Sequence, residues 1–243
     1  MNRLDEALGR PQPTMIVTFA GTVNPDVAAE VASLGAVAEL RADILDSGSL
    51  KFAVEQAKKL GEMPLIVTVR SGTEQGGWKG KESKRFARID KLISYADGVD
   101  IELDSELLVP VIELAHEQDK PAIASHHNFK YTPESDKLEE LWVHALDVDA
   151  DIFKLATQIT RIADYQRLAE FSQKFKGEKI ITLGMGKEPI FRLGLVGLGS
   201  LATYATANKP VATGQMGYRE THQGLIYRYP TYPTPDSGQL LAA

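Results

Sequence analysis

The sequence predicts an α/β fold, a (β/α)8 TIM barrel, and three observations support this prediction. Short runs rich in β-branched residues alternate with amphipathic helical segments from Thr14 onward, as parallel strands joined by crossover helices do. Eight such units fit the 243 residues, which is the usual size of this barrel. An open doubly wound sheet is the alternative, but residues 20–24, after the first strand, contain one glycine and no dinucleotide-binding fingerprint.

In the first half of the chain, strands are marked by β-branched runs and helix ends by proline and glycine. We expect Asn24 to cap the first helix, with Pro25 at its first position and Gly35 after its end. Pro110 implies a kink or a later start of the fourth helix. The expected strands are residues 15–19, 37–41, 65–69 and 99–103. Apolar residues at helical spacing follow each strand, namely Val27, Val31 and Leu34, then Leu50, Ala53, Val54, Ala57 and Leu60, then Phe86, Ile89 and Ile93, then Leu107, Val111 and Leu114.

The second half of the chain repeats this alternation. Thr132 and Pro133 are expected to cap the helix that carries Leu138, Leu141, Trp142 and Ala145. The expected strands are residues 122–125, 151–156, 180–183 and about 211–213. The remaining expected helices are about 160–175, a glycine-rich segment with Leu193 and Val196, and one that begins near Glu220.

Composition favours a single domain over residues 1–243, with a polar segment at about 1–13 and a mobile tail at about 230–243. The formal net charge is -6, from 27 basic and 33 acidic residues without a basic block, so we expect neither nucleic acid nor a membrane as partner. The chain has no cysteine, which excludes thiolate nucleophiles and cysteine metal sites. The polar start is unlike a signal peptide and no run is long enough to span a bilayer, so we expect a cytoplasmic protein.

One lysine, Lys154, interrupts the apolar, strand-like run at residues 151–156. Removal from water disfavours an ammonium relative to the free amine, and a free amine can attack a carbonyl to form an imine. The alternative is a structural lysine whose stem lies on apolar surface while its head group reaches water or Asp151. The run makes Lys154 a candidate nucleophile.

Polar residues gather at the carboxyl ends of the expected strands, where the active sites of such barrels lie. Glu39 and Arg41 share one face of a strand because side chains alternate with a period of two, and Asp100 and Glu102 have the same spacing. The other residues at these ends are Asp43, Arg70, Glu74, Ser125, His126, His127, Lys154, Met185 and Gln215. Their joint occurrence favours one compact polar pocket.

Structural explanations exist for the same residues. An arginine with alternating carboxylates inside a small barrel is often an ion-pair network. Paired carboxylates also occur in glycosidases. His126 and His127 are a weak metal signal, because adjacent residues on a strand point apart.

Taken together, seven motifs resemble those of the type I 3-dehydroquinate dehydratases, which work through a lysine imine. They are Glu39-Leu40-Arg41-Ala42-Asp43, Thr68-Val69-Arg70 with Glu74 and Gly76-Gly77, Asp100-Ile101-Glu102, Ser125-His126-His127-Asn128-Phe129, Asp151-Ile152-Phe153-Lys154-Leu155-Ala156, Met185-Gly186-Lys187-Glu188 with Arg192, and Gly214-Gln215. The resemblance spans most of the chain. It implies a lyase of the shikimate pathway, which converts 3-dehydroquinate to 3-dehydroshikimate on the route to chorismate and the aromatic amino acids.

The resemblance also implies a role for each site residue. Lys154 forms an imine with the C3 ketone, and His127 removes the C2 proton and returns a proton to the departing C1 hydroxyl. Glu74 orients His127 and stabilises its charge. The expected substrate-binding residues are Arg192 for the carboxylate, Glu39, Arg41, Arg70 and Gln215 for the ring hydroxyls, and Met185 as an apolar wall. We expect no metal or organic cofactor, because the iminium supplies the electrophilic pull, and the family implies a homodimer.

Four positions depart from the family pattern. Asn128 stands where the family has aspartate, Val211 where it has serine, Gln75 precedes the double glycine in place of glutamate, and Arg192 lies one residue nearer Met185. Thr213 offers a hydroxyl close to Val211. None of these changes affects Lys154 or His127, so the implied chemistry stands.

Two other functions share some of these features. A class I aldolase uses the same lysine imine but usually binds phosphate, and no clear phosphate loop is present in the sequence. A non-catalytic sensor of the same ligand is the second alternative, although a binding module has no need of an imine-forming lysine.

Overall fold

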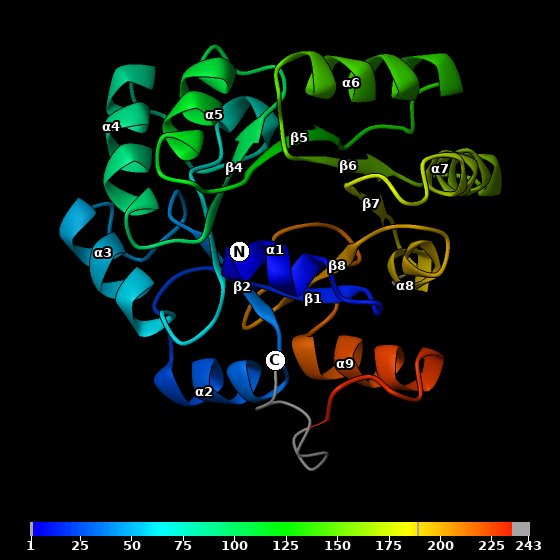
Figure 1. Cartoon of the computed structure of the whole chain (residues 1–243), viewed down its shortest axis with the longest axis horizontal. Coiled ribbons are helices and arrows are strands. Elements are labelled where there is room, and N and C mark those ends of the chain that lie inside the picture. The colour runs from blue at the N-terminus through cyan, green and yellow to red at the C-terminus, as the bar shows by residue number, and fades with distance from the viewer. Residues whose placement is uncertain (1, 189, 235–243) are drawn as a thin grey trace.

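The computed structural model describes residues 2–188 and 190–234, in which eight parallel strands form a nearly closed barrel surrounded by helices (Figure 1). The strands are β1 (Thr14–Phe19), β2 (Val37–Arg41), β3 (Leu65–Thr68), β4 (Gly98–Glu102), β5 (Ala122–Asn128), β6 (Ile152–Gln158), β7 (Ile180–Met185) and β8 (Ala202–Thr206). Each strand from β1 to β7 pairs with its successor, and β8 pairs with β1. Where β7 meets β8, the backbone N–H of Leu201 donates to the Ile180 carbonyl at 2.9 Å. The predicted (β/α)8 fold is confirmed.

The helices begin and end largely where the sequence predicts. They are α1 (Arg3–Leu8), α2 (Pro25–Ser33), α3 (Leu50–Lys59), α4 (Glu82–Ile93), α5 (Leu108–His116), α6 (Ser135–Asp147), α7 (Ile162–Lys174), α8 (Ile190–Val196) and α9 (Tyr218–Arg228), with a 3-10 turn η1 (Gly72–Glu74). Asn24 Oδ1 accepts a hydrogen bond from the Asp26 N–H at 2.9 Å, which caps α2 as expected. In the described part of the chain, no helix combines the length and apolar character that crossing a bilayer requires.

Side chains that point into the barrel form an apolar layer followed by a polar layer. The apolar layer lies near the strand starts and contains Ile16, Val37, Ile66, Ile123, Ile152, Ile181 and Ala202. Two residues later, on the same face of the strands, lie Thr18, Glu39, Thr68, Ser125, Lys154 and Tyr204. The apolar layer excludes water from the end of the barrel where the strands start, so the polar residues are reached only from the carboxyl ends of the strands.

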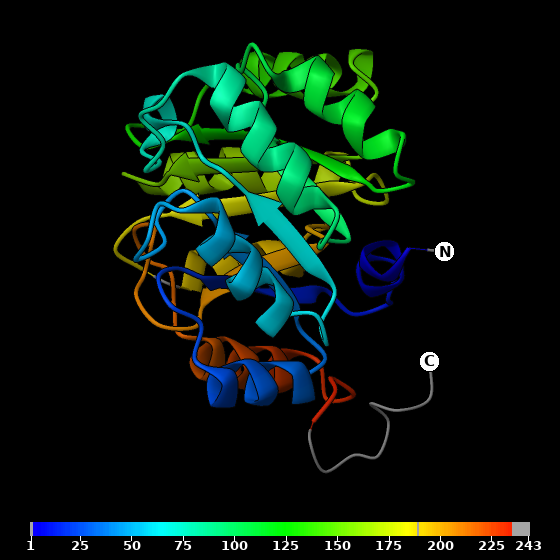
Figure 2. The same cartoon turned by 90° about the vertical axis from the view of Figure 1, so that its left-hand side faces the viewer.

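Helix α1 closes the other end of the barrel. Figure 2 shows it at the end from which the strands start, and Leu4, Ala7 and Leu8 pack into the apolar layer. Residues 1–13 were expected to be a polar segment, and this buried helix was not foreseen because six residues are too few for a helical period to stand out.

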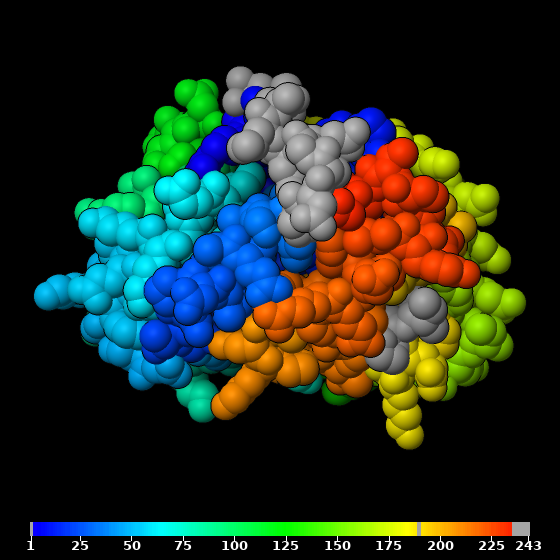
Figure 3. Space-filling model, turned by 90° about the horizontal axis from the view of Figure 1, so that it is seen from below, coloured from blue at the N-terminus to red at the C-terminus, as the bar shows by residue number. Residues whose placement is uncertain are grey.

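Helices α2 and α9, far apart in sequence, lie side by side on the outer face shown in Figure 3. Tyr218 donates its hydroxyl hydrogen to Glu30 Oε2 at 2.8 Å, and Arg219 Nε donates to Glu30 Oε1 at 2.5 Å. These contacts hold the last helix of the barrel against the first one after β1.

The predicted position of the eighth strand is wrong. Residues 211–213 lie in the loop after β8, and the strand itself is Ala202–Thr206, which pairs with β1 through Ile16 and Tyr204. Threonine and tyrosine in this segment have high β propensity, and all five of its residues are buried. Residues 211–213 instead precede Gly214, whose φ of 72° turns the chain.

Smaller differences concern the ends of elements. Strand β5 continues to Asn128 rather than stopping at residue 125, so both histidines belong to it. Glu134 occupies the cap position of α6, whereas the Thr132 hydroxyl lies 2.9 Å from Thr157 Oγ1, so the predicted Thr132 cap is wrong. Helix α5 begins at Leu108, so Pro110 lies in its first turn and causes no kink. Of the two expectations for this proline, a kink or a later start of the helix, the later start is the one observed.

The expected tail is only partly described. Tyr232 is buried, and the Pro233 carbonyl lies 2.8 Å from His222 Nε2. Residues 235–243 lie outside the described residues.

Candidate active site

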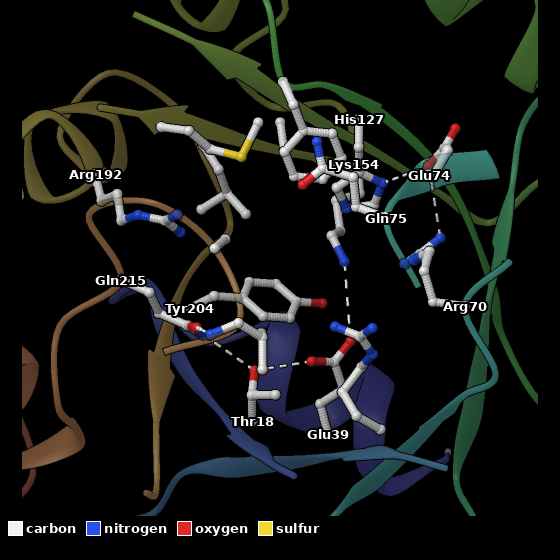
Figure 4. Close-up of a pocket in the computed structure, with 17 residues that line it drawn as sticks. Thr18, Glu39, Arg70, Glu74, Gln75, His127, Lys154, Arg192, Tyr204 and Gln215 are labelled. Atoms are coloured by element: carbon white, nitrogen blue, oxygen red, sulfur yellow. Dashed lines mark hydrogen bonds and ion pairs between the residues drawn. The ribbon is translucent and has the colours of Figure 1, made fainter. Parts of the chain in front are cut away.

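A pocket at the carboxyl ends of the strands collects most of the predicted site residues (Figure 4). It is lined by Thr18, Glu39, Arg41, Arg70, Glu74, Gln75, His127, Phe129, Lys154, Ala156, Leu183, Met185, Arg192, Tyr204, Val211, Ala212 and Gln215. All nine residues expected for catalysis and substrate binding are among them. Seven of the eight strands contribute a lining side chain or the loop that follows them, the exception being β4, so closure of the barrel brings these residues together.

Lys154 lies in the middle of β6, where only 3% of the residue is exposed. Its Nζ lies 2.7 Å from Asp100 Oδ2, 4.0 Å from Glu39 Oε1, and 4.4 Å from the centre of the Tyr204 ring. The apolar stem points into the barrel and places the nitrogen in the pocket. A buried cation in this position has an electrostatic partner and a free approach from the pocket side.

Asp100 is the central anion of the buried network. Its Oδ1 accepts hydrogen bonds from Arg70 Nη2 at 2.6 Å and from the Ser125 hydroxyl at 2.7 Å. Burial alone raises the pKa of Asp100, but the positive charges of Arg70 and Lys154 outweigh burial and hold that pKa well below its ordinary value. Asp100 therefore remains a carboxylate and balances both cations.

Arg70, just after β3, links the acidic residues of β4 to Glu74 in the 3-10 turn η1. It contacts Glu102 at 3.4 Å and Glu74 at 3.9 Å, besides Asp100. Burial by itself lowers the pKa of Arg70, but these carboxylates raise the pKa above its ordinary value. Arg70 is a permanent cation, and most of its donors are already used by the protein.

His127 and Glu74 form a second pair at the pocket wall. His127 Nδ1 lies 2.7 Å from Glu74 Oε2, and the side chains are 12% and 11% exposed. Burial, with Arg70 and Lys154 nearby, lowers the pKa of His127 well below its ordinary value. Burial also raises the pKa of Glu74, to about 8. The imidazole is therefore neutral near pH 7, which is the form that can accept a proton.

The neighbouring histidine is directed away from this pocket. His126 Nδ1 lies 3.3 Å from Asp104 Oδ2, in a neighbouring acidic cavity beside α4 that shares Glu74 and His127 with the pocket. The two histidines point apart because they are consecutive residues on β5.

Glu39 is fixed by threonines on both sides. Thr18 and Thr68 donate hydroxyl hydrogens to its carboxylate at 2.8 and 2.9 Å. Gln215 Nε2 donates to Thr18 Oγ1 at 3.2 Å and to the Ala205 carbonyl at 3.0 Å. Thus Glu39 and Gln215 are held in one hydrogen-bonded chain across β1.

Arg192 lies on the other side of the pocket from Glu74 and Arg70 (Figure 4). Its Nη2 donates to the Thr213 carbonyl at 3.1 Å, and its Nε has no hydrogen-bond partner in the described part of the chain. Only 2% of the residue is exposed, and burial lowers the pKa of its guanidinium to about 10. An incompletely paired buried cation that faces a pocket is suited to an anionic ligand.

The remaining expected residues complete the wall. Arg41 makes a bidentate pair with Asp43 at 3.0 and 2.8 Å, which fixes its guanidinium plane. Met185, at the end of β7, is 1% exposed and supplies an apolar surface.

The departures from the family pattern have identifiable places in the pocket region. Val211 and Ala212 line the pocket, whereas Thr213 contributes its carbonyl to Arg192. Gln75 also lines the pocket and adopts a left-handed φ of 57°. Asn128 Oδ1 accepts hydrogen bonds from the N–H groups of Lys130 and Tyr131, so this side chain stabilises a turn.

Two members of the site, Thr18 and Tyr204, were not singled out from the sequence, and Asp100 was placed at a strand end without a role. Thr18 and Asp100 carry the hydrogen-bond network of the site, and Tyr204 packs beside Lys154. Tyr204 was missed because the eighth strand was placed too late. The alternation in Ala202–Thr206 is the signal that would have found it.

One group of described residues has the spacing of a metal site. Ligand atoms of Glu74, Asp104 and His126 lie within 4.8 Å of one another. Glu74 already contacts His127 there, so binding a cation would compete with that pair.

Comparisons with known proteins agree on one family. The model of the type I 3-dehydroquinase family matches residues 17–231. The 3-dehydroquinate dehydratase of Methanococcoides burtonii is 32% identical over 195 residues, 78% of this chain and 83% of the relative. That of Methanocaldococcus jannaschii is 36% identical over 185 residues, 74% of this chain and 81% of the relative. Among solved structures, the 3-dehydroquinate dehydratase of Aquifex aeolicus aligns with a TM-score of 0.77 and 28% identity, covering 89% of this chain and 99% of that one.

Proposed function

The chain belongs to the type I 3-dehydroquinase family, and we propose on this basis that it dehydrates 3-dehydroquinate to 3-dehydroshikimate through an imine on Lys154. One observation carries the mechanism: a buried lysine nitrogen and a neutral, buried imidazole face the same pocket. Membership of this family favours a dehydratase over the aldolase and the sensor.

Substrate binding begins at Arg192. Its Nε has no hydrogen-bond partner among the described residues, and Arg192 lies opposite the acidic side of the pocket. Both features suit the substrate carboxylate, which a guanidinium binds in a planar geometry. Glu39 and Gln215, already fixed by Thr18, hold ring hydroxyls, together with Arg41 and Arg70. Met185 covers an apolar edge of the ring. This arrangement presents the C3 ketone to Lys154.

The imine is the electron sink of the reaction. Lys154 Nζ attacks C3, and loss of water leaves a C=N bond at that carbon. The protonated imine withdraws electrons from C2, so the C2–H bond becomes acidic enough for an imidazole to break. Asp100 stays ionised beside the nitrogen and stabilises positive charge there throughout.

Proton transfer is assigned to His127. Its Nδ1 contacts Glu74, which leaves Nε2 for the C2 proton when Glu74 is ionised. The resulting imidazolium then protonates the departing C1 hydroxyl, and hydrolysis of the conjugated imine releases the product. One histidine thus acts as base and then as acid, with no metal step required.

We also propose the wider setting that the family implies. The reaction is the third step of the shikimate pathway, towards chorismate and the aromatic amino acids, and the protein works in the cytoplasm as a homodimer. Light scattering during gel filtration tests the oligomeric state, because a monomer mass would contradict the dimer.

The decisive experiment is covalent trapping. The protein is incubated with 3-dehydroquinate and borohydride, and intact mass and peptide mapping locate any adduct. We expect a reduced adduct on Lys154 in the wild type, none in Lys154→Ala, and complete loss of turnover in that variant. Appreciable dehydration by Lys154→Ala, with the fold verified by circular dichroism, would rule out the imine mechanism.

A further inference from the structure

Tyr204 is a buried residue of the pocket that the mechanism above does not use. It lies on β8, where 4% of the residue is exposed, and its ring centre is 4.4 Å from Lys154 Nζ. Figure 4 shows the ring between Gln215 and Lys154, with the hydroxyl directed to the side where Lys154 and Glu39 lie. The phenol is therefore next to the reacting nitrogen.

The Tyr204 hydroxyl meets no hydrogen-bond partner within residues 2–188 and 190–234. Two polar side chains that line the same pocket are already engaged: Glu39 accepts from Thr18 and Thr68, and Gln215 donates to Thr18 and to the Ala205 carbonyl. A buried hydroxyl without a partner is costly, and evolution rarely keeps one without compensation. A phenylalanine would fill the same space without this cost. The presence of the hydroxyl therefore indicates a hydrogen-bond partner that comes from outside the protein, such as a bound ligand.

The hydroxyl is a donor under all working conditions. Burial raises the pKa of Tyr204 well above its ordinary value, and the Glu39 and Asp100 carboxylates raise it further. The phenol therefore keeps its proton, and it can donate a hydrogen bond to a ligand oxygen without transferring that proton.

On the basis of the proposed function, we propose that the Tyr204 hydroxyl is a catalytic donor that binds the ketone oxygen attacked by Lys154. The ring centre lies 4.4 Å from Nζ, and the hydroxyl is directed to the side of the pocket where Lys154 lies, so an oxygen on the attacked carbon comes close to the hydroxyl.

The donor acts in the first and last chemical steps. The lone pair of the neutral Lys154 amine forms the C–N bond, and the C=O π electrons move to the oxygen. One nitrogen-bound proton passes to this oxygen, which gives a carbinolamine. The Lys154 ammonium released one proton to solvent when it became the neutral amine, and an equivalent proton from solvent now reaches the hydroxyl. The hydroxyl leaves as water with the C–O bonding pair, while the nitrogen lone pair forms the C=N bond of the protonated imine. Tyr204 stabilises the charge that develops on the oxygen, as preorganised donors do, and remains a neutral phenol.

The test uses Tyr204→Phe, which keeps the ring and its contact with the Lys154 ammonium but removes the hydroxyl. Full-length protein is mixed rapidly with 3-dehydroquinate and quenched with borohydride at increasing times. The two reduced adducts, which differ by one water, are summed by mass to give the rate of imine formation. We expect this rate to fall about three- to tenfold, the value of one neutral hydrogen bond. We expect the thermal midpoint to stay the same or rise, since an unpaired polar group is lost.

Tyr229→Phe is the matched control. The Tyr229 hydroxyl donates to the Val196 carbonyl at 3.2 Å, away from the pocket-lining residues. Loss of this hydroxyl should lower the thermal midpoint and leave the rate of imine formation unchanged. This is the opposite of the result expected for Tyr204→Phe.

The outcomes separate this inference from the proposed function. If the wild type forms no adduct, both fail. If the wild type forms the adduct and Tyr204→Phe forms it equally fast, only the role of Tyr204 is overturned. A rise in KM without a slower trapping rate would place the hydroxyl on a non-reacting group of the substrate. A midpoint lowered as in Tyr229→Phe would show that the hydroxyl has a structural partner, which also contradicts the proposal.

Discussion

Lys154 and Asp100 form an ion pair, with Nζ 2.7 Å from Oδ2, in which the side chains are 4% and 0% exposed. The two residues are 54 positions apart in the chain. Asp100 also holds Arg70 at 2.6 Å, so one carboxylate balances two buried cations. Burying three charges is expensive, and the arrangement persists because each has a close partner of opposite sign.

Replacing Asp100 with asparagine should therefore destabilise the fold. The amide keeps the shape but leaves Lys154 and Arg70 without their shared anion, and breaking a buried pair costs about 3–5 kcal/mol. Urea unfolding measures the loss. Glu140→Gln, which removes a carboxylate from the exposed pair with Lys137, should cost less than about 1 kcal/mol. Equal losses in the two variants would contradict the central role of Asp100.

Substitution of the two adjacent histidines should have opposite results. His127→Ala should reduce kcat by about 10²–10⁴-fold, the usual contribution of a general base, while an imine with intact substrate still accumulates. His126→Ala should keep near-normal turnover, because the His126 side chain lies beside Asp104 in the neighbouring cavity and is not part of the lining of the pocket that holds Lys154. Steady-state kinetics and borohydride trapping measure both effects. An inactive His126→Ala enzyme with a normal His127→Ala enzyme would reverse the assignment.

The pH dependence of kcat/KM should report the His127–Glu74 pair. The base requires ionised Glu74 and neutral His127, and the pKa of Glu74 is raised to about 8. Below that pH the pair carries an extra proton, so activity should rise as the pH increases through the pair's apparent pKa.

Glu74→Gln tests this assignment. Only His127 then titrates, and its pKa is lowered below its ordinary value, so the rise in activity should move to lower pH. Loss of the orienting carboxylate should also reduce kcat, by about 10- to 100-fold. Glu106→Gln, at an exposed position beyond the pair, is the control and should leave the profile unchanged. A Glu74→Gln profile identical to that of the wild type would show that Glu74 does not set the titration.

Arg192 should act mainly on substrate affinity. Arg192→Met should raise KM by about 10- to 100-fold and lower kcat by a smaller factor, because charge-assisted hydrogen bonds contribute about 1.5–3 kcal/mol. The variant should be at least as stable as the wild type, because the guanidinium is buried and its Nε finds no hydrogen-bond partner in the part of the chain that the structure describes. Kinetics and thermal unfolding check the two expectations separately. An unchanged KM would place the substrate carboxylate elsewhere.

Much of the barrel was predictable because its signals are local. The alternation of β-branched strands and amphipathic helices located seven of the eight strands, and Asn24 with Pro25 marked the start of α2. The period of two placed Glu39 and Arg41 on one face, and both line the pocket. The predicted position of the eighth strand was wrong because Ala202–Thr206 follows a glycine-rich segment that obscured the alternation of strands and helices.

Partnerships between distant residues were beyond such reasoning. The apolar run around Lys154 indicated a candidate nucleophile, and the resemblance of the motifs to a known family indicated imine chemistry at this lysine. Only closure of the barrel decided that Asp100 is the partner of Lys154, that Glu74 reaches His127, and that the Tyr204 hydroxyl has no hydrogen-bond partner among the described residues. The physical reason is that periodicity reports which face a side chain takes on its own strand, whereas charge pairing and burial depend on which strands meet across the barrel.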